Sequence, residues 1–248
     1  MTMSENITEL SNIDSDDFWL NAKSQLIFNQ IKIKGAKILD VGCGTGSLSF
    51  NLALKGHCVD AIDISENSIN KTNIKMQDTT LFNNKPNVWL STIELLEYTG
   101  KYDYIILADI LEHIEDDKKI LNKAFKLLKN DGKLIISVPA IKMLYGTHDI
   151  YCEHIRRYSK NEICSKLIDS GFEIVVARYW NLLLIPVAFF FSKILKKSYP
   201  HSTVNSIKIF NKMLELYYTN FENKVNVPIG MSLFIVASKK LITNKVME

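Results

Sequence analysis

Residues 38–46 read Ile-Leu-Asp-Val-Gly-Cys-Gly-Thr-Gly, and this stretch decides the fold. An apolar run ends in three glycines at alternate positions, and a helix-like pattern follows them. Because glycine lacks a Cβ atom, the backbone can turn sharply and lie against a ligand, while the N–H groups that open the next helix attract negative charge. We therefore predict a strand, a ligand-binding loop and a helix in succession.

An acidic residue stands at the end of the next apolar run. Asp63 follows residues 59–62, where a carboxylate can accept both hydroxyls of a ribose. The dinucleotide fingerprint G-x-G-x-x-G is incomplete, because Ser47 occupies the place of its third glycine. Asp40 would repel a pyrophosphate, but it could accept a hydrogen bond from an ammonium group. The pattern favours a cationic nucleoside cofactor over a dinucleotide.

The octapeptide at 39–46, with its downstream acid, resembles the first two motifs of class I S-adenosylmethionine-dependent methyltransferases. The resemblance implies a Rossmann-like methyltransferase fold, S-adenosyl-L-methionine as the cofactor and methyl transfer as the reaction. The acid expected after the third strand, which would contact the adenine amino group, is not clearly placed, and Thr92 and Glu94 are the options. The implied cofactor-binding residues are Asp40, Gly42, Cys43, Gly44, Thr45, Gly46, Asp63, Ile64, Thr92, Glu94, Ala108 and Asp109.

The composition suits one large α/β domain, since 47% of the 248 residues are hydrophobic. We expect a single methyltransferase domain over 1–248, with an N-terminal helical segment at 1–34 and a helical cap insertion at 181–229. A net charge of +3 with scattered lysines does not imply a nucleic-acid partner. The four cysteines form no C-x-x-C pair and the N-terminus is polar, so we expect a reducing, cytoplasmic location without a signal peptide.

Short apolar runs alternate with helical patterns along the chain, which predicts a doubly wound α/β fold with a mostly parallel, seven-stranded sheet. Strands are expected at 36–41, 57–62, 87–91, 103–108, 132–138, 172–179 and 230–238, and helices at 46–55, 65–77, 116–129 and 160–170. Turns at 130–132 and 170–171 should end two of the helices through a left-handed residue. The family ends its sheet with a reversed hairpin, and here 181–229 would interrupt that hairpin.

Two polar segments follow predicted strands. Leu-Glu-His at 111–113 resembles an element of small-molecule methyltransferases, including quinone and glycan-associated enzymes, and the resemblance makes Asp109, Glu112 and His113 site candidates. His-Ile-Arg-Arg-Tyr-Ser at 154–159 resembles an element of a group often associated with surface-glycan or natural-product pathways. We expect one of its arginines in a salt bridge within the fold and one facing the acceptor. The candidate acceptor contacts are Tyr151, Arg156, Arg157 and Tyr158.

Methyl transfer from a sulfonium requires alignment of donor and acceptor, and removal of a proton if the acceptor is a hydroxyl. Histidine is the natural base, and we predict His154 first, with His113 and His148 in reserve. A purely structural role for His113 is equally consistent with the sequence. His148, Asp149, Glu153 and His154 are metal-ligand types, but their spacing matches no metal motif, and we expect no metal.

Two other functional classes fit the loop less well. A NAD- or nucleotide-sugar-dependent oxidoreductase is disfavoured by Ser47, by Asp40 and by the lack of a Tyr-x-x-x-Lys pair, and a non-catalytic S-adenosylmethionine-binding module by the polar acceptor loop. Residues 180–197 are too short and too interrupted to span a membrane, but their basic end suits an interfacial helix on an anionic bilayer. The alternatives are a cap packed on the sheet or a homodimer interface. We expect a small-molecule, glycan or lipid-linked acceptor, and a cytoplasmic or membrane-peripheral protein.

Overall fold

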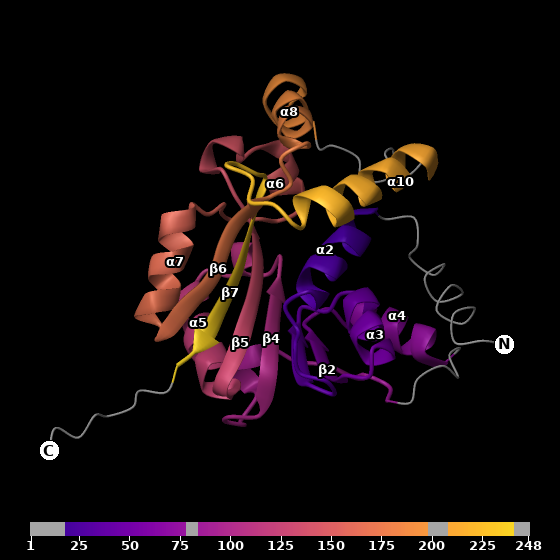
Figure 1. Cartoon of the computed structure of the whole chain (residues 1–248), viewed down its shortest axis with the longest axis vertical. Helices are drawn as coiled ribbons and strands as arrows, with labels where there is room; N and C mark the ends of the chain where they lie inside the picture. Colours follow the sequence, from indigo (N-terminus) through magenta and orange to yellow (C-terminus); the bar gives the residue numbers. More distant parts are fainter. Residues whose placement is uncertain (1–17, 78–83, 198–207, 241–248) are drawn as a thin grey trace, which may run out of the picture.

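The computed structural model of the chain describes residues 18–77, 84–197 and 208–240, and it contains one seven-stranded sheet with the order β3-β2-β1-β4-β5-β7-β6 (Figure 1). The strands are β1 (Lys37–Val41), β2 (Cys58–Asp63), β3 (Asn87–Leu90), β4 (Tyr102–Ala108), β5 (Leu128–Pro139), β6 (Phe172–Trp180) and β7 (Ser232–Lys239). β7 runs antiparallel to β5 and β6, and the other pairings are parallel. The predicted doubly wound fold is confirmed.

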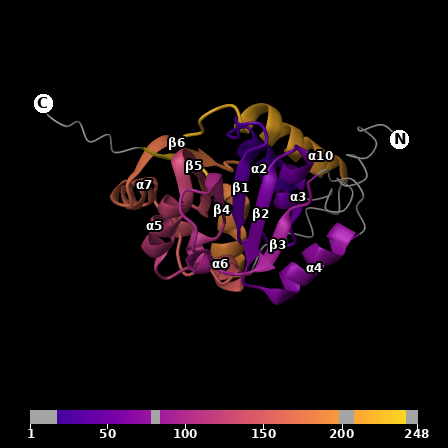
Figure 2. The same cartoon turned by 90° about the horizontal axis from the view of Figure 1, so that it is seen from below.

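Helices cover both faces of this sheet. They are α2 (Phe18–Phe28), α3 (Ser47–Leu54), α4 (Glu66–Gln77), α5 (Asp117–Leu127), α6 (Thr147–Tyr151), α7 (Lys160–Asp169), α8 (Ile185–Phe189) and α10 (Lys208–Tyr217). Shorter helical turns are η1 (Ile93–Leu95), η2 (Leu111–His113), η3 (Lys142–Leu144), η4 (Phe190–Leu195) and η5 (Tyr218–Glu222). Figure 2 shows α2, α3 and α10 gathered together, away from α5 and α7.

The sheet is buried on both faces, which explains the continuous apolar runs in its strands. Successive residues of β4 point to opposite sides, so Ile105 and Leu107 pack in the core beneath α5 and α7. Tyr104 and Ile106 pack in the core formed with α2, α3 and α10. The carboxyl ends of β1, β2 and β4 therefore emerge between two layers of helices, where ligands of this fold bind.

One predicted helix end is wrong and the other is confirmed. α5 ends at Leu127, its following residue is already extended, and β5 begins at Leu128 rather than at 132. The left-handed residue of that region, Asp131 with φ 60°, lies inside the irregular start of β5 and does not cap the helix. Gly171, with φ 91°, ends α7 as predicted. Turn residues alone did not distinguish a helix cap from an irregular strand.

The described residues between β6 and β7 include α8, η4, α10 and η5, and part of this segment holds α2 in place. The indole Nε1 of Trp180 donates to the Oδ1 atom of Asn223 at 2.9 Å, and the Nδ2 atom of Asn223 donates to the carbonyl of Ala22 at 3.0 Å. The rings of Trp19 and Trp180 lie 4.4 Å apart. Residues 1–17 of the expected N-terminal segment and 198–207 of the insertion lie outside the described residues. The insertion thus fixes α2 against the sheet.

Candidate active site

The loop between β1 and α3 has the backbone that its glycines require. Gly42, Gly44 and Gly46 have φ values of 70°, 54° and 80°. These left-handed conformations cost an L-residue free energy, so glycine is the residue that suits them. The hydroxyl of Thr72 in α4 donates to the carbonyl of Gly44 at 3.1 Å, which ties the loop to a neighbouring helix. The sequence signal and the geometry agree at all three glycines.

Asp63 lies at the carboxyl end of β2 and contacts the glycine loop directly. Its Oδ2 atom accepts from the backbone N–H of Gly44 at 2.8 Å, and its Oδ1 atom accepts from that of Ser65 at 2.8 Å. A carboxylate has further lone pairs, so these two bonds leave acceptor capacity for ribose hydroxyls. Ile64, directly after Asp63, is 77% exposed and offers an apolar surface. Both residues lie where the sequence predicted them.

Asp40 lies buried beneath the loop. Its Oδ2 atom accepts from the hydroxyl of Ser49 in α3 at 2.6 Å. Burial raises the pKa of the Asp40 carboxyl to about 6, and the nearby charge of Asp63 adds to the rise. Burial also raises the pKa of the Cys43 thiol, as do the same two carboxylates, so Cys43 is an unreactive thiol. Thr45 is exposed on the same loop.

The two options for the adenine contact follow β3. Thr92 precedes the helical turn η1, and Glu94 lies within it. The carboxylate of Glu94 lies 3.4 Å from the ammonium group of Lys119, and both side chains are partly exposed. Neither residue is buried, so both remain predictions for the adenine contact.

The end of β4 carries a strained acidic residue. Asp109 follows the half-buried Ala108 and has a left-handed backbone with φ 55°. Its Oδ1 atom accepts from the hydroxyl of Ser137 at 2.7 Å, and its Oδ2 atom pairs with the ammonium group of Lys23. Lys23 comes from α2 and is buried. The sequence does not single it out, since Lys23 stands among the polar residues Asn21, Ser24 and Gln25 of the same helix.

Beside Asp109, the carboxylate of Glu112 is buried without a hydrogen-bonding partner. Glu112 is 1% exposed, and neither of its carboxylate oxygens accepts a hydrogen bond from another described side chain or backbone group. Burial raises the pKa of this carboxyl well above its usual range, and the charge of Asp109 raises it further. An unsatisfied buried carboxylate is rare in folded proteins and is a frequent sign of a functional site.

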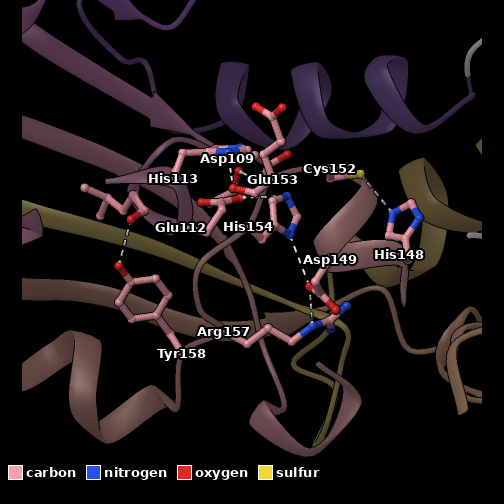
Figure 3. Close-up of polar contacts among 12 residues, drawn as sticks. Asp109, Glu112, His113, His148, Asp149, Cys152, Glu153, His154, Arg157 and Tyr158 are labelled. Atoms are coloured by element: carbon pink, nitrogen blue, oxygen red, sulfur yellow. Dashed lines mark hydrogen bonds and ion pairs between the residues drawn. The ribbon is translucent and has the colours of Figure 1, made fainter. Parts of the chain in front are cut away.

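Two histidines lie next to Glu112, as Figure 3 shows. The rings of His113 and His154 meet edge to face with their centroids 4.9 Å apart. The Nδ1 atom of His113 lies 3.2 Å from the carbonyl of Glu153, and that of His154 lies 3.1 Å from the Oδ1 atom of Asp149. The Nε2 atom of His154 lies 3.9 Å from the Oε1 atom of Glu112. We call Glu112, His113 and His154 the Glu–His–His cluster.

Asp149 contacts the Nδ1 side of the His154 ring. It is fully buried and also accepts from the Nε atom of Arg157 at 2.7 Å and from the backbone N–H of Gly146 at 2.9 Å. Burial opposes ionisation of Asp149, but the hydrogen bonds from His154 and Arg157 outweigh it and lower the pKa of the carboxyl. Asp149 is therefore a charged group that fixes the orientation of the imidazole.

The four residues predicted to contact the acceptor differ in burial and in their partners. Tyr158 is fully buried, and its hydroxyl lies 3.0 Å from the carbonyl of Leu111 and 2.8 Å from the carboxylate of Asp117. Arg157 is buried against Asp149, and Arg156 lies 3.4 Å from Asp117. Both arginines therefore pair within the fold, and the expectation that one of them faces an acceptor finds no support here. Tyr151, which is 75% exposed, is open to a ligand.

His148, the other histidine in reserve, belongs to a different pair. It is buried in α6, and its Nε2 atom lies 3.6 Å from the Sγ atom of Cys152. Among the described residues, the Glu–His–His cluster is the group of three potential cation ligands whose ligand atoms all lie within 4.8 Å of one another. Of the cation-ligand types that the sequence places at 148–154, only His154 belongs to this cluster.

Comparisons with known proteins identify the family of the chain. Residues 32–171 match the model of a methyltransferase domain family. A ubiquinone biosynthesis O-methyltransferase from Rickettsia bellii is 37% identical over 124 residues, which make up 50% of this chain and 50% of that protein. The chain therefore spans about half the length of the curated relatives that it matches.

Solved structures share the fold over most of the chain. An S-adenosylmethionine-dependent methyltransferase from Methanosarcina mazei covers 87% of this chain and 97% of its own, with a TM-score of 0.60 and 19% identity. The magnesium protoporphyrin IX methyltransferase of Synechocystis, solved with bound S-adenosylhomocysteine, covers 94% and 84%, with a TM-score of 0.54 and 20% identity. Because the family model matches more than half of the chain, the chain belongs to the methyltransferase-domain family and is a class I S-adenosylmethionine-dependent methyltransferase.

Proposed function

We propose that this methyltransferase acts on a hydroxyl oxygen of a small-molecule acceptor that has an apolar or lipid portion. The observation that carries the proposal is the pairing of His154 with Asp149 next to Glu112, at the edge of the sheet where this family binds its donor. The similarity to ubiquinone biosynthesis O-methyltransferases, although it covers half of each chain, supports oxygen as the methylated atom. Family membership sets the oxidoreductase alternative aside.

In this proposal the donor lies across the carboxyl ends of β1 and β2. The loop around Gly44 contacts the aminoacyl part of the donor, and Asp63 accepts from the ribose hydroxyls. The 77% exposed side chain of Ile64 lies against the adenine. Thr92 and Glu94 remain the options for the adenine amino group.

The reaction is an in-line displacement. A bond forms between the acceptor oxygen and the methyl carbon while the sulfur–methyl bond breaks, and its electron pair stays on sulfur to give S-adenosylhomocysteine. The hydroxyl proton must leave for the oxygen to become a good nucleophile. We assign His154 as the base that accepts this proton, which is the residue predicted first from the sequence. Asp149 contacts its Nδ1 atom, and its Nε2 atom is directed toward Glu112.

The test measures S-adenosylhomocysteine formation with a panel of hydroxylated acceptors, including a catechol with an alkyl chain. His154→Ala should lower kcat at least about 100-fold and leave donor affinity, measured by calorimetry, near that of the wild type. His57→Asn is the matched control, because His57 precedes β2 at the opposite end of the sheet. If the His154→Ala enzyme keeps its activity within about threefold, when a base would supply a hundredfold, His154 is structural.

The surface beside this loop suits an apolar acceptor. α8 stands beyond the end of the sheet near α6 (Figure 1), and the ammonium group of Lys193 donates to the carbonyl of Tyr145 at 2.6 Å. The exposed apolar side chains of this segment are Leu183, Val187, Phe189, Phe190, Ile194 and Leu195. Lys193, Lys196 and Lys197 are exposed among them. We call this set the α8 surface and infer that it binds the apolar part of the acceptor, or the anionic membrane that carries it.

Liposome flotation tests the membrane contact. No helix among the described residues is long and apolar enough to cross a bilayer, so the contact would be peripheral. Binding to anionic vesicles should be lost at high salt and in the Lys196→Glu/Lys197→Glu double variant, because both changes weaken attraction to lipid headgroups. If the protein does not float at low salt, the α8 surface is a lid, or a dimer interface if sedimentation shows a homodimer.

A further inference from the structure

We propose that Glu112, His113 and His154 bind one divalent metal cation, and that the acceptor hydroxyl binds this cation in the reaction. The inference rests on the proposed function and deepens it, since His154 then promotes loss of the hydroxyl proton as a ligand of the cation and does not take the proton itself. We predicted no metal from the sequence, because the ligand types within residues 148–154 match no metal motif by their spacing.

The donor set has the right chemistry and nearly the right geometry. Two imidazoles and one carboxylate are ligands for first-row divalent cations such as Zn²⁺, Mn²⁺ and Co²⁺. The three atoms that they offer lie within 4.8 Å of one another, and those of His154 and Glu112 are 3.9 Å apart. Ligand atoms about 2.1 Å from a cation lie about 3–3.5 Å apart. Side-chain rotations that move each ligand atom by under about 1 Å would therefore bring the three atoms to that spacing.

Both imidazoles are oriented as metal ligands usually are. A metal-binding histidine typically uses its second nitrogen on a carboxylate or a backbone carbonyl, which fixes the tautomer and the ring plane. The Nδ1 atom of His154 has the carboxylate of Asp149, and that of His113 has the carbonyl of Glu153. Arg157 in turn holds Asp149. Each ring therefore keeps its Nε2 lone pair for another partner.

Glu112 provides the second, independent observation. It is 1% exposed, and its two carboxylate oxygens accept no hydrogen bond from another described residue. The nearby cation, Lys23, is already paired with Asp109. A buried carboxylate needs a compensating charge or donors, and a divalent cation between Glu112 and the two imidazoles would supply it.

Such a cation would explain the chemistry of the site. A bound divalent cation lowers the pKa of an attached oxygen, so the acceptor hydroxyl would lose its proton to solvent near neutral pH. The resulting oxygen would attack the methyl carbon as the sulfur–methyl bond breaks. Three protein ligands leave coordination positions open, and two adjacent acceptor oxygens could occupy them. We therefore expect catechols to be better acceptors than matched monophenols.

The experiment titrates chelator-treated full-length protein with Co²⁺ and follows the visible absorption of the bound ion. Wild type should bind one Co²⁺ without a thiolate charge-transfer band, since Cys152 is not a ligand. Glu112→Gln and His154→Ala should bind Co²⁺ at least about 100-fold more weakly. Glu153→Gln makes the same chemical change on the neighbouring exposed residue and should bind like wild type. Co²⁺ should also raise the Tm of wild type and of Glu153→Gln, but not that of Glu112→Gln.

The outcomes separate this inference from the proposed function. Equal Co²⁺ binding in all four proteins, or none in wild type, overturns the cation site, and so does full methyl transfer by the chelator-treated enzyme. That last result would leave the proposed function standing with His154 as a direct base. Conversely, cluster-dependent Co²⁺ binding without methyl transfer to any hydroxylated acceptor would overturn the proposed function and keep the cation site. If Glu112→Gln does not fold, His113→Ala replaces it.

Discussion

A substitution at Gly44 distinguishes an effect on cofactor binding from an effect on folding better than a substitution at Gly42 or Gly46 does. A Cβ atom built on Gly42 would lie 1.9 Å from the Cδ1 atom of Ile110, and one on Gly46 would lie 2.6 Å from the Cγ2 atom of Thr72. Substitutions there would disturb packing and cost about 1–3 kcal/mol beyond the backbone strain. A Cβ atom on Gly44 meets no other protein atom within 4 Å. Any large effect of a side chain at 44 on binding must therefore come from the ligand.

The expected magnitudes follow from the backbone. Gly44 has φ 54°, and an L-residue in this region costs about 1–2 kcal/mol. In a chain of this size each kcal/mol shifts Tm by about 2–4 °C, so Gly44→Ala should lower Tm by roughly 2–8 °C. Gly35, with φ 62° and an equally open environment before β1, is the matched control. Gly35→Ala should lower Tm by a similar amount.

Binding is measured by calorimetry with S-adenosylhomocysteine. Gly44→Val should weaken affinity by at least about 100-fold, or about 2.7 kcal/mol, because its side chain would occupy the space where the aminoacyl part of the ligand lies. Gly35→Val should leave the affinity unchanged. Unchanged affinity in folded Gly44→Val, or an equal loss in both variants, would refute contact between this loop and the cofactor.

Three further predictions concern buried groups. Because the pKa of Asp40 rises from 3.8 to about 6 on folding, its contribution to the free energy of unfolding is complete below about pH 3.8 and is lost as the pH rises through about 6. The free energy of unfolding of Asp40→Asn, measured with urea, should therefore be about 2–3 kcal/mol higher than that of wild type at pH 8 but not at pH 4. This variant should also bind the donor more weakly. A difference in the free energy of unfolding that does not change with pH would contradict this prediction. Tyr158→Phe should lose about 1–3 kcal/mol, measured by urea unfolding, because it removes a buried hydroxyl that lies 3.0 Å from the Leu111 carbonyl and 2.8 Å from the Asp117 carboxylate, and unchanged stability would contradict this. Asn223→Ala should cost about 2–4 kcal/mol, since it removes the partners of both Trp180 and Ala22, and hydrogen exchange should show α2 opening first.

The geometry of the glycine loop and of Asp63 could be predicted from the sequence because its signals are local. The left-handed glycines of the loop, the apolar runs of the strands and the acid after β2 each follow from a few neighbouring residues. Gly44 and Asp63 accordingly lie where they were predicted and contact each other. The start of β5 was mispredicted, because turn residues alone cannot distinguish a helix cap from an irregular strand paired with β4.

The arrangement around Glu112 and His154 was decided by tertiary structure. Glu112 and His154 follow different strands, and they meet because β4 and β5 are neighbours whose following loops pack together. Burial turned Arg157 and Tyr158 from expected acceptor contacts into supports of the loop, and it brought Lys23 of α2 to Asp109. The sequence by itself determined the succession of strands and helices along the chain and the position of the glycine loop, since backbone geometry and hydrophobic periodicity are local properties. The pairing of charged groups depends on which surfaces the packed helices and loops bury together, and only the folded chain decides that.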